Sequence, residues 1–124
     1  MIKYTEDHEW VRMDSDTDAT VGITDFAQEQ LGELVYVELP NIAASVSQGD
    51  DCAVGESFKA AGDVKSPVSG TIVSCNESLD DTPELINENA MGEGWLFTIN
   101  LDDPTELEGL MDESDYQAYL TSLE

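Results

Sequence analysis

The sequence predicts one mainly β domain spanning residues 1–124, with short helices at its periphery and a helical carboxyl end. Short runs of apolar and β-branched residues alternate with turn-forming residues along most of the chain. No internal repeat or linker interrupts these runs. With 40% hydrophobic residues in 124 positions, the chain has enough apolar surface for one core, so its acidity does not indicate disorder.

The first forty residues predict short strands, one helix and a further strand. Residues 9–13 and 19–23 carry strand patterns, and five Asp, Ser and Thr residues between them favour a turn. The Thr24 hydroxyl is suited to cap a helix that ends at Gly32. Residues 34–39 then have the pattern of a strand, which a proline ends.

The middle of the chain predicts three strands, at residues 52–58, 64–68 and 71–75. Residues 60–63 and 69–70 carry the turn signals between them. This arrangement places Lys59 at the end of a strand, where the chain enters a tight turn.

The last third predicts a turn-rich stretch, one strand and a helical tail. Residues 79–94 are rich in turn formers, and apolar residues then alternate over residues 95–101. The segment 103–106, DPTE, has an acceptor at the cap, proline at the first helical position and glutamate three residues after the cap, which predicts a helix start. One face of a closing helix is formed by Tyr116, Tyr119, Leu120 and Leu123.

The charge balance limits the classes of partner. The chain has 28 acidic and 4 basic residues and a formal net charge of −24. Repulsion between like charges argues against nucleic acid or an anionic membrane as a partner, and it favours a monomer. The same charge can steer the protein toward enzymes with basic rims around their active sites, but a merely solvated surface and adaptation to high salt are alternatives.

The cysteines, the histidine and the hydropathy pattern argue against a zinc protein and a membrane protein. Cys52, Cys75 and His8 are too few ligands for a closed zinc site, so we expect two buried thiols and no metal. No stretch approaches the roughly 18 apolar residues that a membrane helix needs. The start of the chain lacks the pattern of a secretion signal, which predicts a cytoplasmic protein.

Lys59 is the basic residue with the most informative position. A lysine amine is protonated near neutral pH, so an enzyme that modifies it must bring an activated donor. The protein itself supplies presentation, because an amine at the tip of a stiff turn can enter a narrow active site while the flanking strands stay folded.

The segment 56–70, ESFKAAGDVKSPVSG, resembles the lipoylation segment of glycine cleavage H proteins. In that family a Glu-Ser pair precedes the modified lysine and a Ser-Pro-Val-Ser-Gly run follows it. The likeness extends over nearly the whole chain, through further ordered matches at residues 4–5, 8–11, 22–25, 27–32, 37–40 and 92–95.

Three residues near Lys59 depart from the family pattern. Phe58 and Gly55 stand where the family usually has branched aliphatic residues, and we expect Phe58 to alter recognition by the enzyme that attaches the group. Lys65 is a second lysine in the same hairpin, at a position that is usually uncharged. The flanks also lack the Met-Lys-Met pattern of biotin carriers.

The resemblance implies a barrel-sandwich hybrid of two antiparallel sheets, with (R)-lipoate covalently attached to Lys59. The protein would be a carrier without a catalytic centre of its own. The lipoyl arm would accept an aminomethyl group from a pyridoxal-phosphate glycine decarboxylase and present it to a folate-dependent aminomethyltransferase. Dihydrolipoamide dehydrogenase would then reoxidise the arm, and lipoate-attaching enzymes would load it.

The resemblance also implies that Glu9 and Asp63 hold the loaded arm in a sheltered cleft, through charge-assisted hydrogen bonds to its amine. The competing interpretations are a solvated Glu9 and an Asp63 that serves only the turn. For His8 we favour structural packing over function.

Three alternatives for the function stay open at this level. The protein could relay lipoyl or octanoyl groups to other enzymes, or it could be an acidic interaction module in which Lys59 is never modified. An enzyme in its own right is the weakest alternative, since the sequence offers no activated nucleophile or metal cluster.

Overall fold

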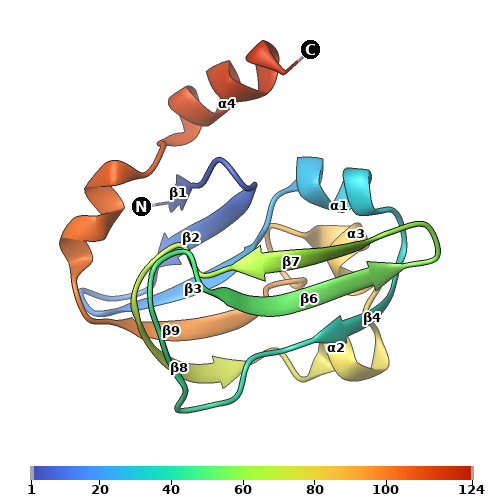
Figure 1. Cartoon of the computed structure of the whole chain (residues 1–124), viewed down its shortest axis with the longest axis horizontal. Helices are drawn as coiled ribbons and strands as arrows, with labels where there is room; N and C mark the ends of the chain where they lie inside the picture. The colour runs from blue at the N-terminus through green and yellow to red at the C-terminus, as the bar shows by residue number, and fades with distance from the viewer. Residues whose placement is uncertain (1, 124) are drawn as a thin grey trace.

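The fold consists of two antiparallel β-sheets with helices at the edges, as the computed structural model of residues 2–123 shows (Figure 1). The larger sheet has the strand order β1-β2-β3-β9-β8-β5, and the smaller one has the order β4-β6-β7. The strands are β1 (Ile2–Tyr4), β2 (Glu9–Met13), β3 (Asp18–Ile23), β4 (Leu34–Glu38), β5 (Ser45–Val46), β6 (Asp51–Ser57), β7 (Ala61–Lys65), β8 (Gly70–Cys75) and β9 (Phe97–Leu101). The expected mainly β architecture is confirmed.

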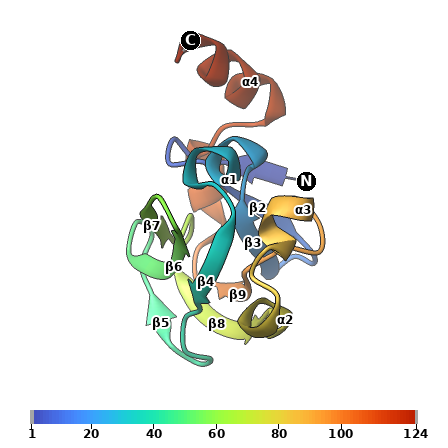
Figure 2. The same ribbon diagram turned by 90° about the vertical axis from the view of Figure 1, so that its right-hand side faces the viewer.

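The helices lie at the periphery and are short. They are α1 (Asp25–Leu31), α2 (Ser78–Asp81), α3 (Leu85–Asn89), the 3₁₀ helix η1 (Pro104–Gly109) and α4 (Glu113–Ser122). Figures 1 and 2 both place α4 at one end of the molecule, beyond α1 and β1. As predicted, the Thr24 hydroxyl caps α1 by accepting the Ala27 amide, and Gly32 ends it with a φ of +87°.

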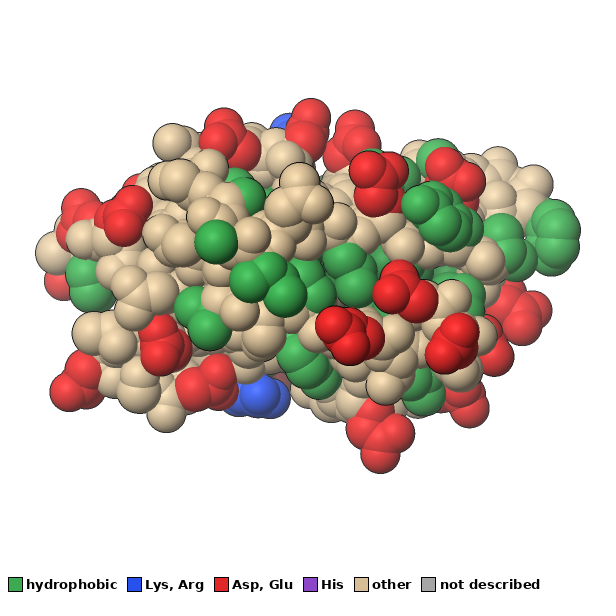
Figure 3. Space-filling view, turned by 90° about the horizontal axis from the view of Figure 1, so that it is seen from below, with side chains coloured by type: hydrophobic (Ala, Val, Ile, Leu, Met, Phe, Trp, Pro, Cys, Tyr) green, Lys and Arg blue, Asp and Glu red, His purple; other side chains and the backbone are tan. Residues whose placement is uncertain are grey.

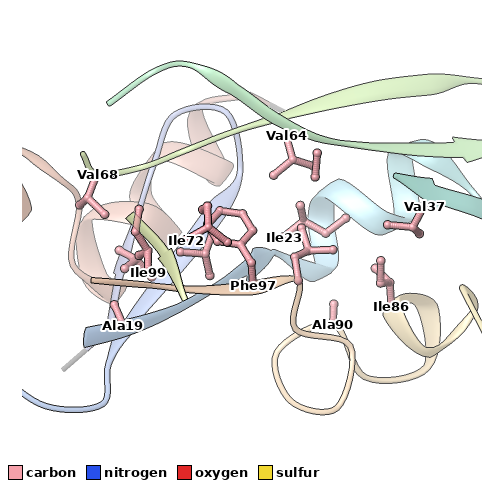
Figure 4. Close-up of a cluster of buried hydrophobic side chains, with 14 of the residues drawn as sticks. Ala19, Ile23, Val37, Val64, Val68, Ile72, Ile86, Ala90, Phe97 and Ile99 are labelled. Atoms are coloured by element: carbon pink, nitrogen blue, oxygen red, sulfur yellow. The ribbon is translucent and has the colours of Figure 1, made fainter. Parts of the chain in front are cut away.

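The main core lies between the two sheets. Figure 4 shows Val64 of β7 pointing toward Ile23 and Phe97 of the larger sheet, with Val37, Ile86 and their neighbours at one end. These side chains remove a large apolar area from water, which is the dominant stabilising contribution to such a fold.

A second cluster fills the opposite face of the larger sheet, which explains why β3 is buried on both faces. Its centre is Trp10, which is fully buried and donates its indole hydrogen to Ala90 O at 3.0 Å. Tyr4 and Tyr116 stack with their ring centroids 4.6 Å apart, which attaches α4 to β1. Only glycine fits at position 22, because an added Cβ would lie 2.6 Å from the Trp10 ring.

The turn predicted at residues 60–63 was placed wrongly. Glu56 pairs with Ala61 and Gly55 with Gly62, so residues 61–63 belong to β7 and the turn occupies residues 58–60. The predicted strand at residues 64–68 ends at Lys65, shortly before Pro67, which has no amide hydrogen to donate to a ladder.

Two other regions differ from the sequence prediction. The turn-rich stretch 79–94 contains α2 and α3, which bury Leu79 and Ile86, and β9 begins only at Phe97. The tail is divided, since η1 ends at Gly109 and Met111 then pairs with Tyr4 before α4 begins.

Candidate functional site

Lys59 lies in the three-residue turn that joins β6 to β7. The turn projects from the edge of the molecule (Figure 1), and the Lys59 side chain is exposed. Within residues 2–123 no carboxylate lies within 4 Å of its amine. The amine is therefore free to meet another protein.

The Ser57 hydroxyl organises this turn. It donates a hydrogen bond to Leu31 O at 2.5 Å, and it accepts hydrogen bonds from the amides of Ala60 at 3.1 Å and Lys59 at 3.3 Å. Its contact with Ala60 O is longer, at 3.2 Å, and that carbonyl already accepts the Ser57 amide at 2.8 Å. One side chain thus satisfies the turn and ties it to the end of α1.

Leu31, the last residue of α1, packs on a cross-strand pair of glycines. A Cβ added at Gly62 would lie 3.0 Å from Leu31 Cδ2, and one added at Gly55 would lie 3.7 Å from Leu31 Cδ1. Gly55 and Gly62 are register partners in β6 and β7. The missing side chain at Gly62 lets α1 approach the hairpin closely, whereas a Cβ at Gly55 would make only ordinary van der Waals contacts.

Gly32 provides room for the Lys59 side chain itself. A Cβ on Gly32 would lie 2.8 Å from Lys59 Cε, so the aliphatic part of the lysine passes directly over this glycine. The end of the lysine side chain is flexible and can move aside, so the φ of +87° is the feature that requires glycine at this position. Gly32 thus ends the helix and also forms the surface on which the lysine lies.

Asn87 of α3 holds the segment beneath Lys59. Its Oδ1 accepts the Leu34 amide at 2.8 Å, and its Nδ2 donates to Gln28 Oε1 at 2.8 Å and to Gly32 O at 2.9 Å. Sequence reasoning missed Asn87, because its partners lie more than 50 residues away. It also treated Gly32 only as a helix end.

Two hollows flank the α1–hairpin junction. One is an open groove of about 550 Å³ beside Gly32, and its wall includes Glu29, Glu33, Glu84 and Glu88. The other is a smaller cleft of about 190 Å³ between α1, β7 and the segment before β2. Its lining is Asp7, His8, Glu9, Ile23, Ala27, Gln30, Leu31, Gly62, Asp63 and Val64.

Glu9 and Asp63, the two carboxylates singled out from the sequence, both line the smaller cleft. Glu9 is not solvated, since only 2% of it is exposed. It accepts the Thr5 hydroxyl at 2.7 Å and the Lys65 amide at 3.3 Å. Burial raises its pKa to about 6, although both hydrogen bonds oppose the rise.

Asp63 differs from Glu9 in its exposure. It lies within β7 opposite Val54, so the alternative that it serves the turn is wrong. Its side chain is exposed at the mouth of the cleft. With Asp7, which is also exposed, the cleft therefore offers one buried and two exposed carboxylates beside apolar side chains.

His8 packs at one end of the cleft and links it to α4. Its Nδ1 lies 2.9 Å from the Tyr116 hydroxyl, and its ring centroid lies 4.4 Å from that of Phe26. Burial lowers its pKa. The backbone of His8 has a φ of +68°, an uncommon conformation for a non-glycine residue.

The cysteines of residues 2–123 form no disulfide and show no sign of an activated thiol. Cys52 and Cys75 are unpaired and only partly buried, rather than buried as expected. Burial raises the pKa of Cys52 to about 11, which keeps it a protonated thiol and a weak nucleophile. The described residues contain no cluster of metal-ligating side chains, and none of their helices is long and apolar enough to span a bilayer.

Comparison with known proteins matches these features to one family. The sequence profile described as "Glycine cleavage H-protein" matches residues 2–123. The chain belongs to the glycine cleavage H-protein family. It is 52% identical over 123 residues to the glycine cleavage system H protein of Parvibaculum lavamentivorans, covering 99% of this chain and 98% of that one.

Two further relatives agree with this assignment. The H protein of Shewanella loihica is 53% identical over 119 residues, covering 96% of this chain and 92% of that one. The crystal structure of an H protein from Mycobacterium marinum superposes with a TM-score of 0.88 at 35% identity, covering 97% of this chain and 96% of that one. The resemblance seen in the sequence and the barrel-sandwich architecture are both confirmed.

Membership of the H-protein family defines the class of function. The protein is a lipoyl carrier of the glycine cleavage system, a non-catalytic shuttle that carries lipoate covalently. Its partners are the decarboxylase, aminomethyltransferase and dihydrolipoamide dehydrogenase components of that system.

The raised pKa of Glu9 predicts a pH-dependent difference in stability. The carboxyl is protonated in both states below about pH 4.5, whereas above pH 6 the folded state holds a buried charge. The free energy of unfolding therefore falls by about 2 kcal/mol from this group as the pH rises through that window. We expect the stability of Glu9→Gln relative to the parent, measured by urea unfolding, to improve by about this amount between pH 4 and pH 7.

The matched control is Glu6→Gln, which removes an exposed carboxylate from the turn just before β2. If the two variants change equally relative to the parent, the burial of Glu9 does not act as described.

Proposed function

We propose that Lys59 is the lipoylated residue. One observation carries this proposal: the exposed Lys59 side chain stands on a turn that the Ser57 hydroxyl ties to α1, with Gly32 as the surface beneath it. The surroundings suit an acylated lysine. The stem lies against backbone rather than in a pocket that would hold the amine, and an apolar cleft lies across Leu31 from the turn.

The chain's own contribution is presentation and shelter. The dithiolane ring of the bound lipoyl group supplies the redox and group-transfer chemistry. Acylation removes the positive charge of Lys59, which lowers the cost of placing the side chain on apolar surface or in a desolvated tunnel. Attachment to a fixed turn keeps the arm at millimolar-scale local concentration when a partner docks.

We propose that Glu9 and Asp63 retain the amine of the loaded arm in the smaller cleft. Both carboxylates line it, and the neighbouring apolar side chains Ile23, Leu31 and Val64 exclude water. With a pKa of about 6, Glu9 is mostly ionised at neutral pH and able to pair with a cation. Acidification through pH 6 would neutralise it and weaken the hold.

We further infer that residues 1–124 act as one lipoyl-carrier domain that works in the cytoplasm as a monomer. A net charge of −24 supports the monomer, because copies of the chain repel each other, and it supports steering toward basic partner surfaces.

The attachment site is tested by intact mass and by exchange activity. After incubation with a lipoate-attaching enzyme and its substrates, the parent should gain the mass of one lipoyl group and support the exchange of glycine carboxyl with bicarbonate. Lys59→Arg should gain no mass and show no exchange. Lys65→Arg, which changes the other lysine of the hairpin, is the matched control and should behave as the parent. Modification of the Lys59→Arg variant would refute the assignment.

The retaining role is tested on the loaded arm. With the aminomethyltransferase omitted, the parent should release ammonia slowly, because the cleft excludes water. Asp63→Asn should release it about three- to tenfold faster, since a neutral amide makes a weaker hydrogen bond to a cation. Asp51→Asn, at the far end of the same hairpin, is the control. Equal rates in all three proteins would leave Asp63 without this role.

A further inference from the structure

Phe58, directly before Lys59, is the most exposed large apolar side chain among the described residues. It is 93% exposed at the start of the turn. Val35 and Tyr36 of β4 are also exposed, at 44% and 51%. Covering an exposed phenylalanine with another protein lowers the free energy, because apolar surface leaves water. The position of Phe58 beside Lys59 therefore suits contact with a protein that acts on this lysine.

An irregularity in β4 exposes two consecutive apolar side chains close to the turn. The register between β4 and β6 shifts between Leu34 and Tyr36, so Val35 is an extra residue and both it and Tyr36 are exposed. Tyr36 lies opposite Glu56 and Leu34 opposite Ser57, so Phe58 begins the turn directly after the end of the ladder beside which Val35 and Tyr36 lie. We call Val35, Tyr36 and Phe58 the apolar patch.

Carboxylates surround the patch. Glu33, Glu38 and Glu56 are exposed and lie next to its members in β4, β6 and the segment before β4. At the end of the molecule where Figure 1 places the β6–β7 turn, Figure 3 shows hydrophobic side chains at the surface among acidic ones. A complementary surface would have an apolar pocket with a basic rim.

We propose that the apolar patch is the docking surface for the enzyme that attaches lipoate to Lys59; this inference rests on the proposed function of Lys59. The reach of the bare side chain favours this enzyme. The amine of an extended lysine lies only roughly 6 Å from its Cα, whereas the lipoyl arm roughly doubles that reach. An enzyme that acts on the bare amine must therefore approach within contact of Phe58, while enzymes that act on the ring can remain farther away.

Each residue of the apolar patch has its own role in binding the attaching enzyme. Phe58 enters an apolar pocket beside the active-site entrance and fixes the direction from which Lys59 enters. Tyr36 and Val35 cover the neighbouring surface. The carboxylates of Glu33, Glu38 and Glu56 guide the encounter with basic residues on the enzyme's rim, so the attachment reaction weakens as salt is raised.

The test is the steady-state kinetics of lipoate attachment to the unmodified full chain, with a lipoate ligase, lipoate and ATP. Phe58→Ala is expected to raise KM about tenfold, because the apolar area that the pocket covers is lost, and to change kcat less than twofold. Tyr36→Ala should raise KM severalfold. Val73→Ala is the matched control, since Val73 is 49% exposed at the corresponding irregularity of β8 and lies outside the patch.

Several outcomes separate this proposal from the assignment of Lys59. If the parent gains no lipoyl group on Lys59, the proposed function fails. If the parent is modified but Phe58→Ala retains its KM, only the docking surface is refuted. A rise in KM confined to the decarboxylase step, or a KM for attachment that does not depend on salt, would also contradict it. Unchanged melting temperatures would show that the variants fold, as expected for exposed side chains.

Discussion

The hydrogen bond from the Ser57 hydroxyl to Leu31 O is the interaction on which the rest of the site depends. It joins the hairpin tip to the end of α1 across 26 positions of sequence, and the same oxygen accepts the amides of Lys59 and Ala60. A two-stranded hairpin alone would bend freely at its tip. With the turn tied to a helix, the lysine leaves the protein from a fixed place and in a fixed direction.

The junction of α1 with the hairpin serves two purposes at once. The Leu31 carbonyl accepts the Ser57 hydroxyl, and the Leu31 side chain packs on the glycine pair. Leu31 also lines the cleft that contains Glu9 and Asp63. The proposed base of the lipoyl arm and the proposed shelter for its loaded end therefore both involve the same helix terminus. Asn87 extends this arrangement to α3 through the Gly32 carbonyl.

The acidity of the chain is compatible with this arrangement because little of it is buried. Glu9 is the buried carboxylate among the described residues, and two hydrogen bonds compensate part of its cost. The ion pairs of the described part, Arg12 with Asp14 and Lys65 with Asp7, are exposed and add at most about 1 kcal/mol each. Most of the charge faces water and the partners.

The helix boundaries that the sequence predicted correctly depend on residues close together in the chain. The Thr24 cap, the Gly32 helix end and the start at Pro104 each depend on residues within one turn. The turn at residues 60–63 was misplaced because cross-strand pairing outweighed the turn preference of glycine and aspartate. Helices α2 and α3 were missed, since four or five residues are too few for a periodic pattern.

The site shows the same division between local and distant information. A family pattern was sufficient to propose Lys59, Glu9 and Asp63. The contacts around Lys59 could not be predicted from the sequence, because Asn87, Gly32 and Leu34 come together only through packing of distant segments. No sequence pattern predicts that Gly32 lies beneath the Lys59 side chain. None predicts that Leu31 packs on the cross-strand glycine pair either.

A stiffened turn displays Lys59, and its stiffness can be measured by amide hydrogen exchange in Ser57→Ala. Removing the hydroxyl leaves the Lys59 and Ala60 amides without their acceptor and unties the tip from Leu31. We expect both amides to exchange roughly tenfold faster than in the parent, while amides in β3 and β9 keep their protection. Exchange at the parental rate in the turn would show that something other than this serine holds the lysine in place.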